Sequence, residues 1–169
     1  MDPRKLTHLN GLYLSELPLD EFARRVREHV ARLDWAQGID EALFLKVCRL
    51  MQSRTPVYTQ AADWKYFFAG IPDYDERAVR KVLKAEGARA AIEQARAALA
   101  ASDFTDAGIA QAIRSTEAAL GLGEGKLNQP LRVAATGTTI GAGIYETLAV
   151  LGRDRSLARI DHALSTHMA

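Results

Sequence analysis

Hydrophobic residues recur along almost the whole chain at the spacing of an amphipathic helix. Phe22, Val26, Val30 and Leu33 follow one another at intervals of four, four and three residues, which places them on one helical face. No run of β-branched residues alternates with polar ones as a half-buried strand would. Alanine and leucine, both strong helix formers, are plentiful. The sequence therefore predicts an all-α fold.

Several residues mark where the helices begin and end. Asp20, Asp75 and Thr105 are predicted N-caps, because their side-chain oxygens can accept a hydrogen bond from the first helical turn. An aromatic-rich segment stops at Gly70, with Pro72 just beyond it, which is a helix-ending pattern. We therefore expect a break near residues 66–72 that separates two helical parts.

Composition narrows the class of protein. The chain has 169 residues, enough for one domain or two small ones, with 22 Lys+Arg against 21 Asp+Glu and a net charge of +1. The basic excess that typifies nucleic-acid binders is missing. A single cysteine excludes an internal disulfide and a multi-cysteine zinc site. No apolar stretch approaches the roughly 20 residues of a membrane span, and the first residues lack a signal-peptide pattern. We expect a cytoplasmic protein with no membrane association.

No group of residues forms a recognisable catalytic or metal site. The segment Gly137–Gly143 lacks the Gly-Lys-Ser/Thr ending of a phosphate loop, so we interpret it as a tight connection between helices. Cys48 lies at helical spacing among apolar residues and is predicted to be a core residue. The histidines share no metal-ligand spacing and are interpreted as solvated surface residues: His8, His29, His162 and His167. Whether the chain belongs to an enzyme is left open, and no catalytic or metal-binding residue is predicted.

An aromatic cluster, made up of Trp64, Tyr66, Phe67 and Phe68, lies next to the predicted break. Such a cluster can pack in a core or offer a platform on which bases stack. The core interpretation is favoured, because packed helices must meet at this point.

A resemblance to a known family rests on three segments: DPRKLTHLNGLYLSELPLDEF, LMQSRTPVYTQAADWKYFF and NQPLRVAATGTTIGAGIYETLAVLGRDRSLARID. Together they resemble the C-terminal, anticodon-binding half of bacterial glutamyl-tRNA synthetase. The first segment is similar to the stretch that follows the KMSKS loop in that family. LMQSRTPVYTQAADWKYFF resembles its first anticodon-binding helix-loop-helix. The most specific match is NQPLRVAATGTTIGAGIYETLAVLGRDRSLARID, which follows the family pattern of QPLR, TG, a short loop, a G-[IL]-[FY]-E helix start and R-x-L-x-R.

The resemblance covers essentially the whole chain, but it does not include the catalytic half of the family. The HIGH and KMSKS motifs, which bind ATP in class I synthetases, have no counterpart here. The resemblance therefore implies that no cofactor binds this chain and that ATP and Mg²⁺ belong to the catalytic half. The start of the sequence falls inside the family's linking region. That position predicts either a piece of a longer protein or a gene product made of this half alone.

The resemblance also implies RNA-binding residues in the first half of the chain. Arg54 falls on the arginine that the family uses at the third anticodon base, where glutamate and glutamine tRNAs differ. The N3 and O2 acceptors of cytosine suit a guanidinium, whereas the N–H donors of guanine oppose it. The alternative role for Arg54 is a cation at a helix C-terminus.

A second set of implied contacts lies in the last segment. Arg132 matches the arginine of the family's PLR, expected at the middle anticodon base or its backbone. Its alternative role is an ion pair on the surface or between helices. Gly141 and Ala142 replace a hydroxyl residue and a proline of the family's anticodon-contacting loop. Ile144 and Tyr145 keep the apolar and aromatic types, which can stack on a base or pack at the start of a helix.

Taken together, the sequence predicts a two-part α-helical cage that binds the anticodon loop of tRNA(Glu) as a monomer. Residues 1–18 are assigned to the linking region, 19–66 to a first anticodon-binding subdomain and 67–169 to a second. A catalytic synthetase half, in the same chain or a separate one, is the expected further partner. The net charge of +1 predicts weak, salt-sensitive binding. The alternative is a standalone helical interaction protein that binds a protein partner and no tRNA.

Overall fold

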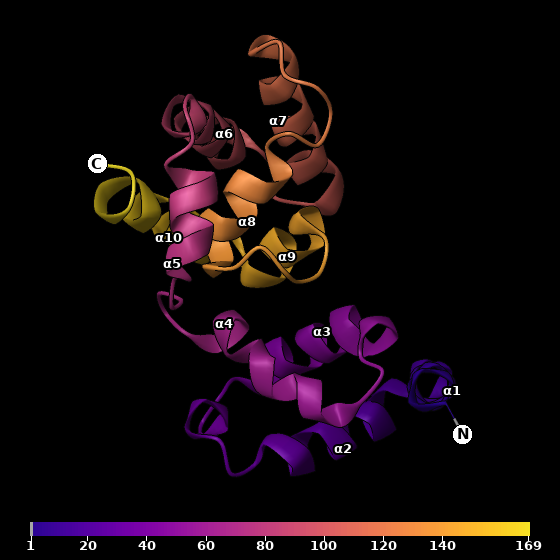
Figure 1. Cartoon of the computed structure of the whole chain (residues 1–169). Coiled ribbons are helices and arrows are strands. Elements are labelled where there is room, and N and C mark those ends of the chain that lie inside the picture. Colours follow the sequence, from indigo (N-terminus) through magenta and orange to yellow (C-terminus); the bar gives the residue numbers. More distant parts are fainter. Residues whose placement is uncertain (1) are drawn as a thin grey trace. The chain divides into compact units, whose positions relative to one another are not determined.

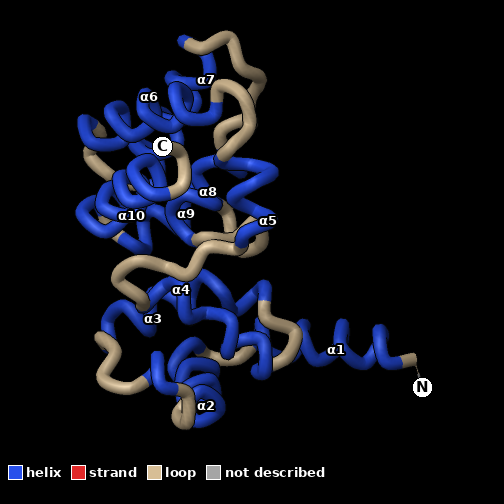
Figure 2. The backbone as a smooth tube through the Cα atoms, turned by 60° about the vertical axis from the view of Figure 1, so that its left-hand side comes forward, coloured by secondary structure: helices blue, strands red, loops and turns tan. Residues whose placement is uncertain are grey.

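The computed structural model describes residues 2–169, which divide into two compact units between Ala69 and Gly70. Figures 1 and 2 show that all regular structure in the described chain is helical, which confirms the all-α prediction. The elements of the first unit are α1 (Pro3–Glu16), α2 (Leu19–Val30), η1 (Asp34–Ala36), α3 (Glu41–Met51), η2 (Gln52–Arg54), η3 (Tyr58–Trp64) and α4 (Lys65–Phe68). Here η denotes a short 3₁₀ or π helix.

The core of the first unit forms where α2 packs against α3 and η3. Phe22, Val26 and Val30 of the predicted apolar face are buried there, and the Phe22 ring lies 5.9 Å from the Tyr58 ring of η3. Leu33, predicted on the same face, lies beyond the end of α2 and is half-buried.

Trp64 and Phe67 are also buried, whereas Tyr66 and Phe68 are half-buried. The core interpretation of the aromatic cluster is therefore confirmed for Trp64 and Phe67. The fully buried core side chains include Phe22, Val26, Val30, Val47 and Cys48.

The second unit is a bundle in which α10 packs against α6 and α8, and α7 packs against α6 and α9. Its elements are α5 (Glu76–Ala78), the π-helical η4 (Val79–Leu83), α6 (Ala88–Ala101), α7 (Asp106–Ala119), α8 (Asn128–Thr136), α9 (Ile144–Leu151) and α10 (Arg153–Thr166). The helices α6 to α10 each contribute apolar side chains to the core of this unit. Its fully buried side chains include Ile92, Leu99, Ile109, Ile113, Leu131, Leu148 and Ile160.

Two of the three predicted N-caps are confirmed. The Asp75 carboxylate accepts a hydrogen bond from the Ala78 amide (2.7 Å), and the Thr105 hydroxyl accepts one from Gly108 (3.0 Å). The prediction for Asp20 is wrong, because α2 begins at Leu19 and places Asp20 inside its first turn. There its carboxylate interacts favourably with the helix dipole instead of capping an amide.

The N-terminal helix α1 was not predicted. Two local signals explain why it forms. The Asp2 carboxylate accepts a hydrogen bond from the Arg4 amide (2.9 Å), and Pro3 occupies the first helical turn, where proline is tolerated because its missing N–H would have no helical partner. Within α1, only Leu14 is buried.

The histidines divide into two groups. His8 and His29 are exposed, as predicted. His162 and His167 are half-buried and pack against the Tyr74 ring, with centroid distances of 5.9 Å and 4.3 Å, so the solvated interpretation is wrong for this pair. The Cys48 thiol is buried as predicted, and burial raises its pKa to about 12. Among residues 2–169 no helix is long and apolar enough to cross a membrane.

Candidate nucleic-acid interface

Arg54 lies at the end of η2, directly after α3, and is exposed. Its Nη1 donates a hydrogen bond to the Leu50 carbonyl in the last turn of α3 (3.2 Å). The guanidinium is therefore held at the C-terminal end of a helix, where a cation is stabilised by the helix dipole. This contact ties one guanidinium nitrogen to the helix end, while the residue as a whole stays exposed.

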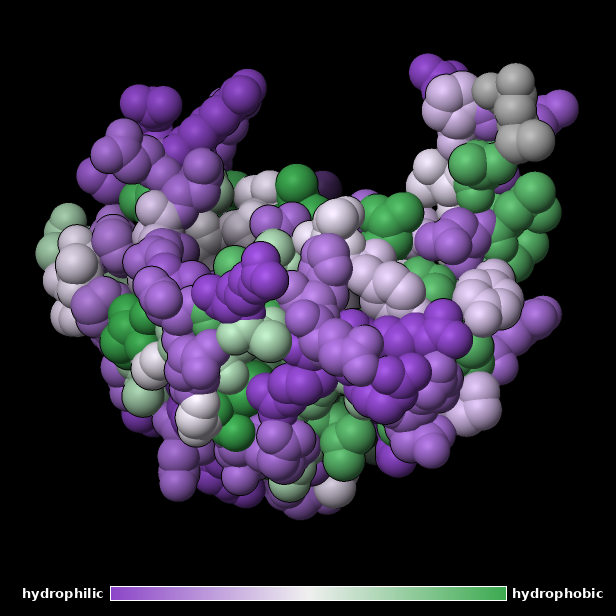
Figure 3. All heavy atoms as spheres, turned by 90° about the horizontal axis from the view of Figure 1, so that it is seen from below, coloured by the Kyte–Doolittle hydropathy of each residue, from purple (hydrophilic) through white to green (hydrophobic). Residues whose placement is uncertain are grey.

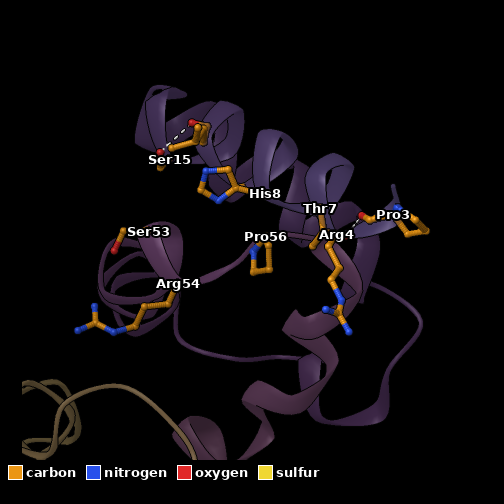
Figure 4. A pocket seen from close by; sticks show the side chains of 10 residues that line it. Pro3, Arg4, Thr7, His8, Ser15, Ser53, Arg54 and Pro56 are labelled. Atoms are coloured by element: carbon orange, nitrogen blue, oxygen red, sulfur yellow. Dashed lines mark hydrogen bonds between the residues drawn. The ribbon is translucent and has the colours of Figure 1, made fainter. Parts of the chain in front are cut away.

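A cleft of about 580 Å³ lies beside Arg54, between α1 and the turn that follows α3. Figure 4 shows Pro56 at its centre, with His8 on one wall and the Arg54 side chain extending away from Pro56. Hydroxyl and cationic side chains line much of the cleft, including Arg4, Thr7, Ser15 and Ser53. Such groups bind phosphate and ribose oxygens, so the surroundings of Arg54 are chemically suited to an RNA strand.

In the second unit, the loop at residues 138–143 is tied down by α8. Arg132 donates from Nη1 to the Ala142 carbonyl, and Gln129 donates from Nε2 to the Thr139 carbonyl (3.4 Å). These donors are the glutamine and arginine of the QPLR motif. They lie three residues apart and therefore on one face of the helix. Arg132 thus has a local role as a positioning residue.

The loop buries some of its predicted contact residues and exposes others. Ala142 and Ile144 are only 1% and 2% exposed, whereas Gly141 is exposed and offers its backbone. Ile140, which sequence reasoning did not single out, is 79% exposed at the loop tip. A nucleotide approaching this loop would meet Ile140 and the Gly141 backbone, and it would reach the side chains of Ala142 and Ile144 only after the loop rearranged.

Tyr145 is half-buried at the start of α9 and faces a cation from another helix. The Arg114 guanidinium carbon, on α7, lies 5.8 Å from the centre of the Tyr145 ring. Arg114 also approaches Glu124 (3.7 Å). A guanidinium over a ring is a pair on which a base can stack. Arg114 was missed in the sequence analysis, since no local pattern shows that α7 lies beside the loop.

The predicted site residues thus form two groups, each within one unit. Arg54 belongs to the first unit, and the second unit holds Arg132 with the loop that ends at Tyr145. Within residues 2–169, no three His, Cys, Asp or Glu side chains are grouped so that they could hold a metal ion.

The sequence matches known proteins over nearly its whole length. The family described as anticodon binding domain matches residues 21–164. The chain belongs to this family. The glutamate–tRNA ligase of Moorella thermoacetica is 33% identical over 96% of the chain, and that of Streptomyces coelicolor is 34% identical over 97%. The resemblance inferred from the sequence motifs is therefore confirmed.

Solved structures show the same fold. A glutamate tRNA ligase from Elizabethkingia meningosepticum, solved with its amino acid, superposes with a TM-score of 0.82 at 23% identity over 98% of the chain. This anticodon-binding chain spans only about a third of the length of each protein: 34% of either curated ligase and 33% of the solved one.

Proposed function

We propose that the chain recognises the anticodon loop of tRNA(Glu) and so selects the substrate for glutamylation in the cytoplasm. Membership of the anticodon-binding family supports this function. The observation that carries the specificity is the exposed Arg54, which stands where the family resemblance places the base-reading arginine. The ligation itself, with ATP and Mg²⁺, is assigned to the part of the relatives that this chain does not span.

The chemistry of the third anticodon base explains why an arginine suits this position. Anticodon bases are unstacked and present their Watson–Crick edges, which is the setting in which proteins read RNA sequence. Cytosine offers acceptors there, and a planar guanidinium donates N–H bonds in a fork. Guanine presents donors at the same edge, so its approach leaves opposed N–H groups that are costly to desolvate. Discrimination thus rests on rejecting guanine as much as on binding cytosine.

Arg54→Gln is expected to lower the preference for tRNA(Glu) over tRNA(Gln) about tenfold, equivalent to about 1.4 kcal/mol. Glutamine carries both a donor and an acceptor, so it tolerates guanine as well as cytosine. The measurement is a fluorescence titration of the chain with each tRNA at low salt. Arg32→Gln, which removes the same charge from another exposed position of the first unit, should leave the ratio unchanged.

An unchanged affinity ratio in Arg54→Gln would contradict the assignment of Arg54. Absence of any tRNA binding by the unsubstituted chain at low salt would contradict the whole proposal and would favour the protein-interaction alternative. Binding should weaken as salt is added, because each contact between a cationic side chain and a phosphate releases bound counterions.

Arg132→Met is expected to weaken tRNA(Glu) binding about tenfold by freeing the loop at residues 138–143. The substitution removes the donor to the Ala142 carbonyl, and a hydrogen bond from a charged group contributes about 1.5–3 kcal/mol. Hydrogen exchange of the loop amides, measured without tRNA, should accelerate. Arg77→Met removes the same charge from exposed α5 and should change neither quantity. Weaker binding with unaltered loop exchange would instead make Arg132 a direct RNA contact.

A further inference from the structure

Polarity alone does not mark a further binding surface on this chain. Hydrophilic side chains predominate on the face seen in Figure 3, and 25% of all residues are charged. Several arginines of the second unit are engaged by the chain itself, as when Arg96 pairs with Asp161 and Arg153 donates to two backbone carbonyls. A group of exposed cations without such partners is therefore the more informative feature, because its charge stays available to a ligand.

Three such cations lie together near the start of the second unit. Arg80, Lys81 and Lys84 are exposed, and no described residue forms an ion pair or a hydrogen bond with any of their side chains. They occupy η4 and the residue that follows it, whereas Val79 and Leu83, on the other side of the same turns, are buried against the bundle. We call Arg80, Lys81 and Lys84 the η4 ridge.

The η4 ridge concentrates a charge that the chain as a whole lacks. Residues 78–88 contain the three cations and one carboxylate, Glu86, which gives this segment a net charge of +2. All 169 residues together carry only +1, so the rest of the chain carries −1. The field of the ridge also acts on its surroundings, because burial, together with the charges of His162 and Lys84, lowers the pKa of His167.

A purely structural role is the alternative for these cations. Arg80 and Lys81 lie in the last turn of η4, where the helix dipole stabilises a positive charge. The two roles predict different measurements. Removal of cations that serve the helix dipole lowers the stability of the chain, whereas removal of cations that bind a polyanion lowers the affinity for that polyanion and its dependence on salt.

The position of the η4 ridge indicates an RNA strand as its partner. The Asp75 amide donates to the Gly137 carbonyl (2.9 Å), so α5 begins where α8 ends and the loop at residues 138–143 starts. From this junction α5 and η4 continue alongside α8, as Figure 1 shows. At about 1.5 Å per residue, the ridge lies about 7–14 Å along the helix axis from the junction. An RNA whose bases reach the loop would therefore bring neighbouring phosphates to the ridge.

We infer that the η4 ridge binds the phosphodiester backbone of the RNA strand that flanks the anticodon bases. Lysine and arginine neutralise phosphates, and each such contact releases counterions. Phosphate contacts position a nucleic acid without reading its sequence. The ridge thus supplies affinity, whereas base selection belongs to other residues. This inference rests on the proposed tRNA-binding function, but it does not require that Arg54 reads an anticodon base.

One variant with the three substitutions Arg80→Gln, Lys81→Gln and Lys84→Gln tests the inference. In titrations with tRNA(Glu) over a range of salt concentrations, the slope of log affinity against log salt should be about 2 smaller in magnitude, since a phosphate contact to a single strand contributes about 0.7. Affinity at low salt should fall about tenfold. The ratio of the affinities for tRNA(Glu) and tRNA(Gln) should not change, because phosphate contacts carry no sequence information.

Two controls separate the placement of charge from its amount. Arg77→Gln removes a cation one turn earlier, where three carboxylates within four residues offset its charge, and it should leave the salt dependence unchanged. A second triple variant removes three exposed cations that lie on separate segments, and its slope should change by less than about 1. Its substitutions are Arg32→Gln, Lys46→Gln and Lys126→Gln.

The result that overturns the inference differs from the one that overturns the proposed function. An unchanged salt slope in the η4 variant, with tRNA still bound, would overturn the inference alone, and a lower Tm in that case would assign the cations to the helix dipole. Equal losses in the two triple variants would also overturn it, because net charge would then set the affinity. Absence of tRNA binding by the unsubstituted chain would overturn both.

The test does not depend on the stability of the triple variant. Because all three side chains are exposed, its Tm should stay close to that of the unsubstituted chain. Lys84→Gln alone, at the residue after η4, should reduce the magnitude of the salt slope by about 0.7. An unchanged slope in this single variant would contradict a phosphate contact at Lys84.

Discussion

Gly137→Ala is expected to lower the free energy of unfolding by about 4 kcal/mol. Gly137 ends α8 with φ of +77°, a left-handed conformation that L side chains rarely adopt. A Cβ built there would lie 1.9 Å from the Asp73 carbonyl oxygen and 3.1 Å from the Tyr74 Cα. Both neighbours are backbone, so no side-chain rotation relieves the clash. Separation of the two segments would also break the hydrogen bond from the Asp75 amide to the Gly137 carbonyl (2.9 Å).

Gly87→Ala is the matched control, because Gly87 has the same φ of +77° but no atom within 4 Å of an added Cβ. The Gly87→Ala variant should therefore lose only the free energy that a left-handed backbone conformation costs an alanine, about 1 kcal/mol. Urea unfolding and thermal unfolding, both followed by circular dichroism, measure the two variants, and we expect their Tm values to differ by about 6–12 °C. Equal stability of the two variants would show that the segment at Asp73 moves away at little cost.

The helical parts of the fold were predictable where spacing and caps agree. The apolar face from Phe22 to Val30 is buried, and Asp75 and Thr105 begin their helices as expected. The helix α1 was missed although its Asp2–Pro3 start signal and the helical spacing of Leu6, Leu9 and Tyr13 are both visible in the sequence. The π-helical turn η4, which packs against α8, was likewise not predicted.

The candidate site was predictable only as a set of positions. The family resemblance placed Arg54, Arg132 and the loop after α8, but exposure depends on tertiary packing. The burial of Ala142 and Ile144 could not be foreseen, because it follows from how the loop folds back onto the bundle. Arg114 was missed for the same reason: it lies on α7 and meets Tyr145 only in the folded unit. The RNA contacts themselves remain predictions.

The R-x-L-x-R motif illustrates how a family pattern can be structural even in an RNA-binding domain. Its last arginine, Arg159, is fully buried and donates from Nη1 to the Ala135 carbonyl (2.9 Å) and from Nε to the Gly70 carbonyl (3.2 Å). Burial, together with the charge of Arg155, lowers the pKa of Arg159 to about 10, so the guanidinium is still charged at neutral pH. It joins α10 to the end of α8 and to the first residue of the second unit.

Arg159→Met is therefore expected to destabilise the chain by about 3 kcal/mol. Methionine keeps part of the buried volume but leaves the Ala135 and Gly70 carbonyls without this donor. Removal of the desolvated charge offsets some of that loss, which is why the expected cost stays below that of Gly137→Ala. Replacing both partners of a buried polar pair by apolar groups can leave stability unchanged or raise it. That compensation is not possible here, because the two carbonyls belong to the backbone and stay in place. Urea unfolding at pH 7 measures the difference.

Arg96→Met is the matched control, because it removes the same single positive charge. It should lower the free energy of unfolding by less than about 1 kcal/mol. Arg96 makes a two-pronged ion pair with Asp161 on α10, with both N–O distances at 2.8 Å, but it does so at the surface. Water replaces the lost partner of Asp161, whereas Ala135, whose carbonyl accepts from Arg159, is fully buried. A smaller loss in Arg159→Met than in Arg96→Met would contradict this ranking and would mean that the bundle closes around methionine. The expected ranking assigns Arg159 to the stability of the second unit.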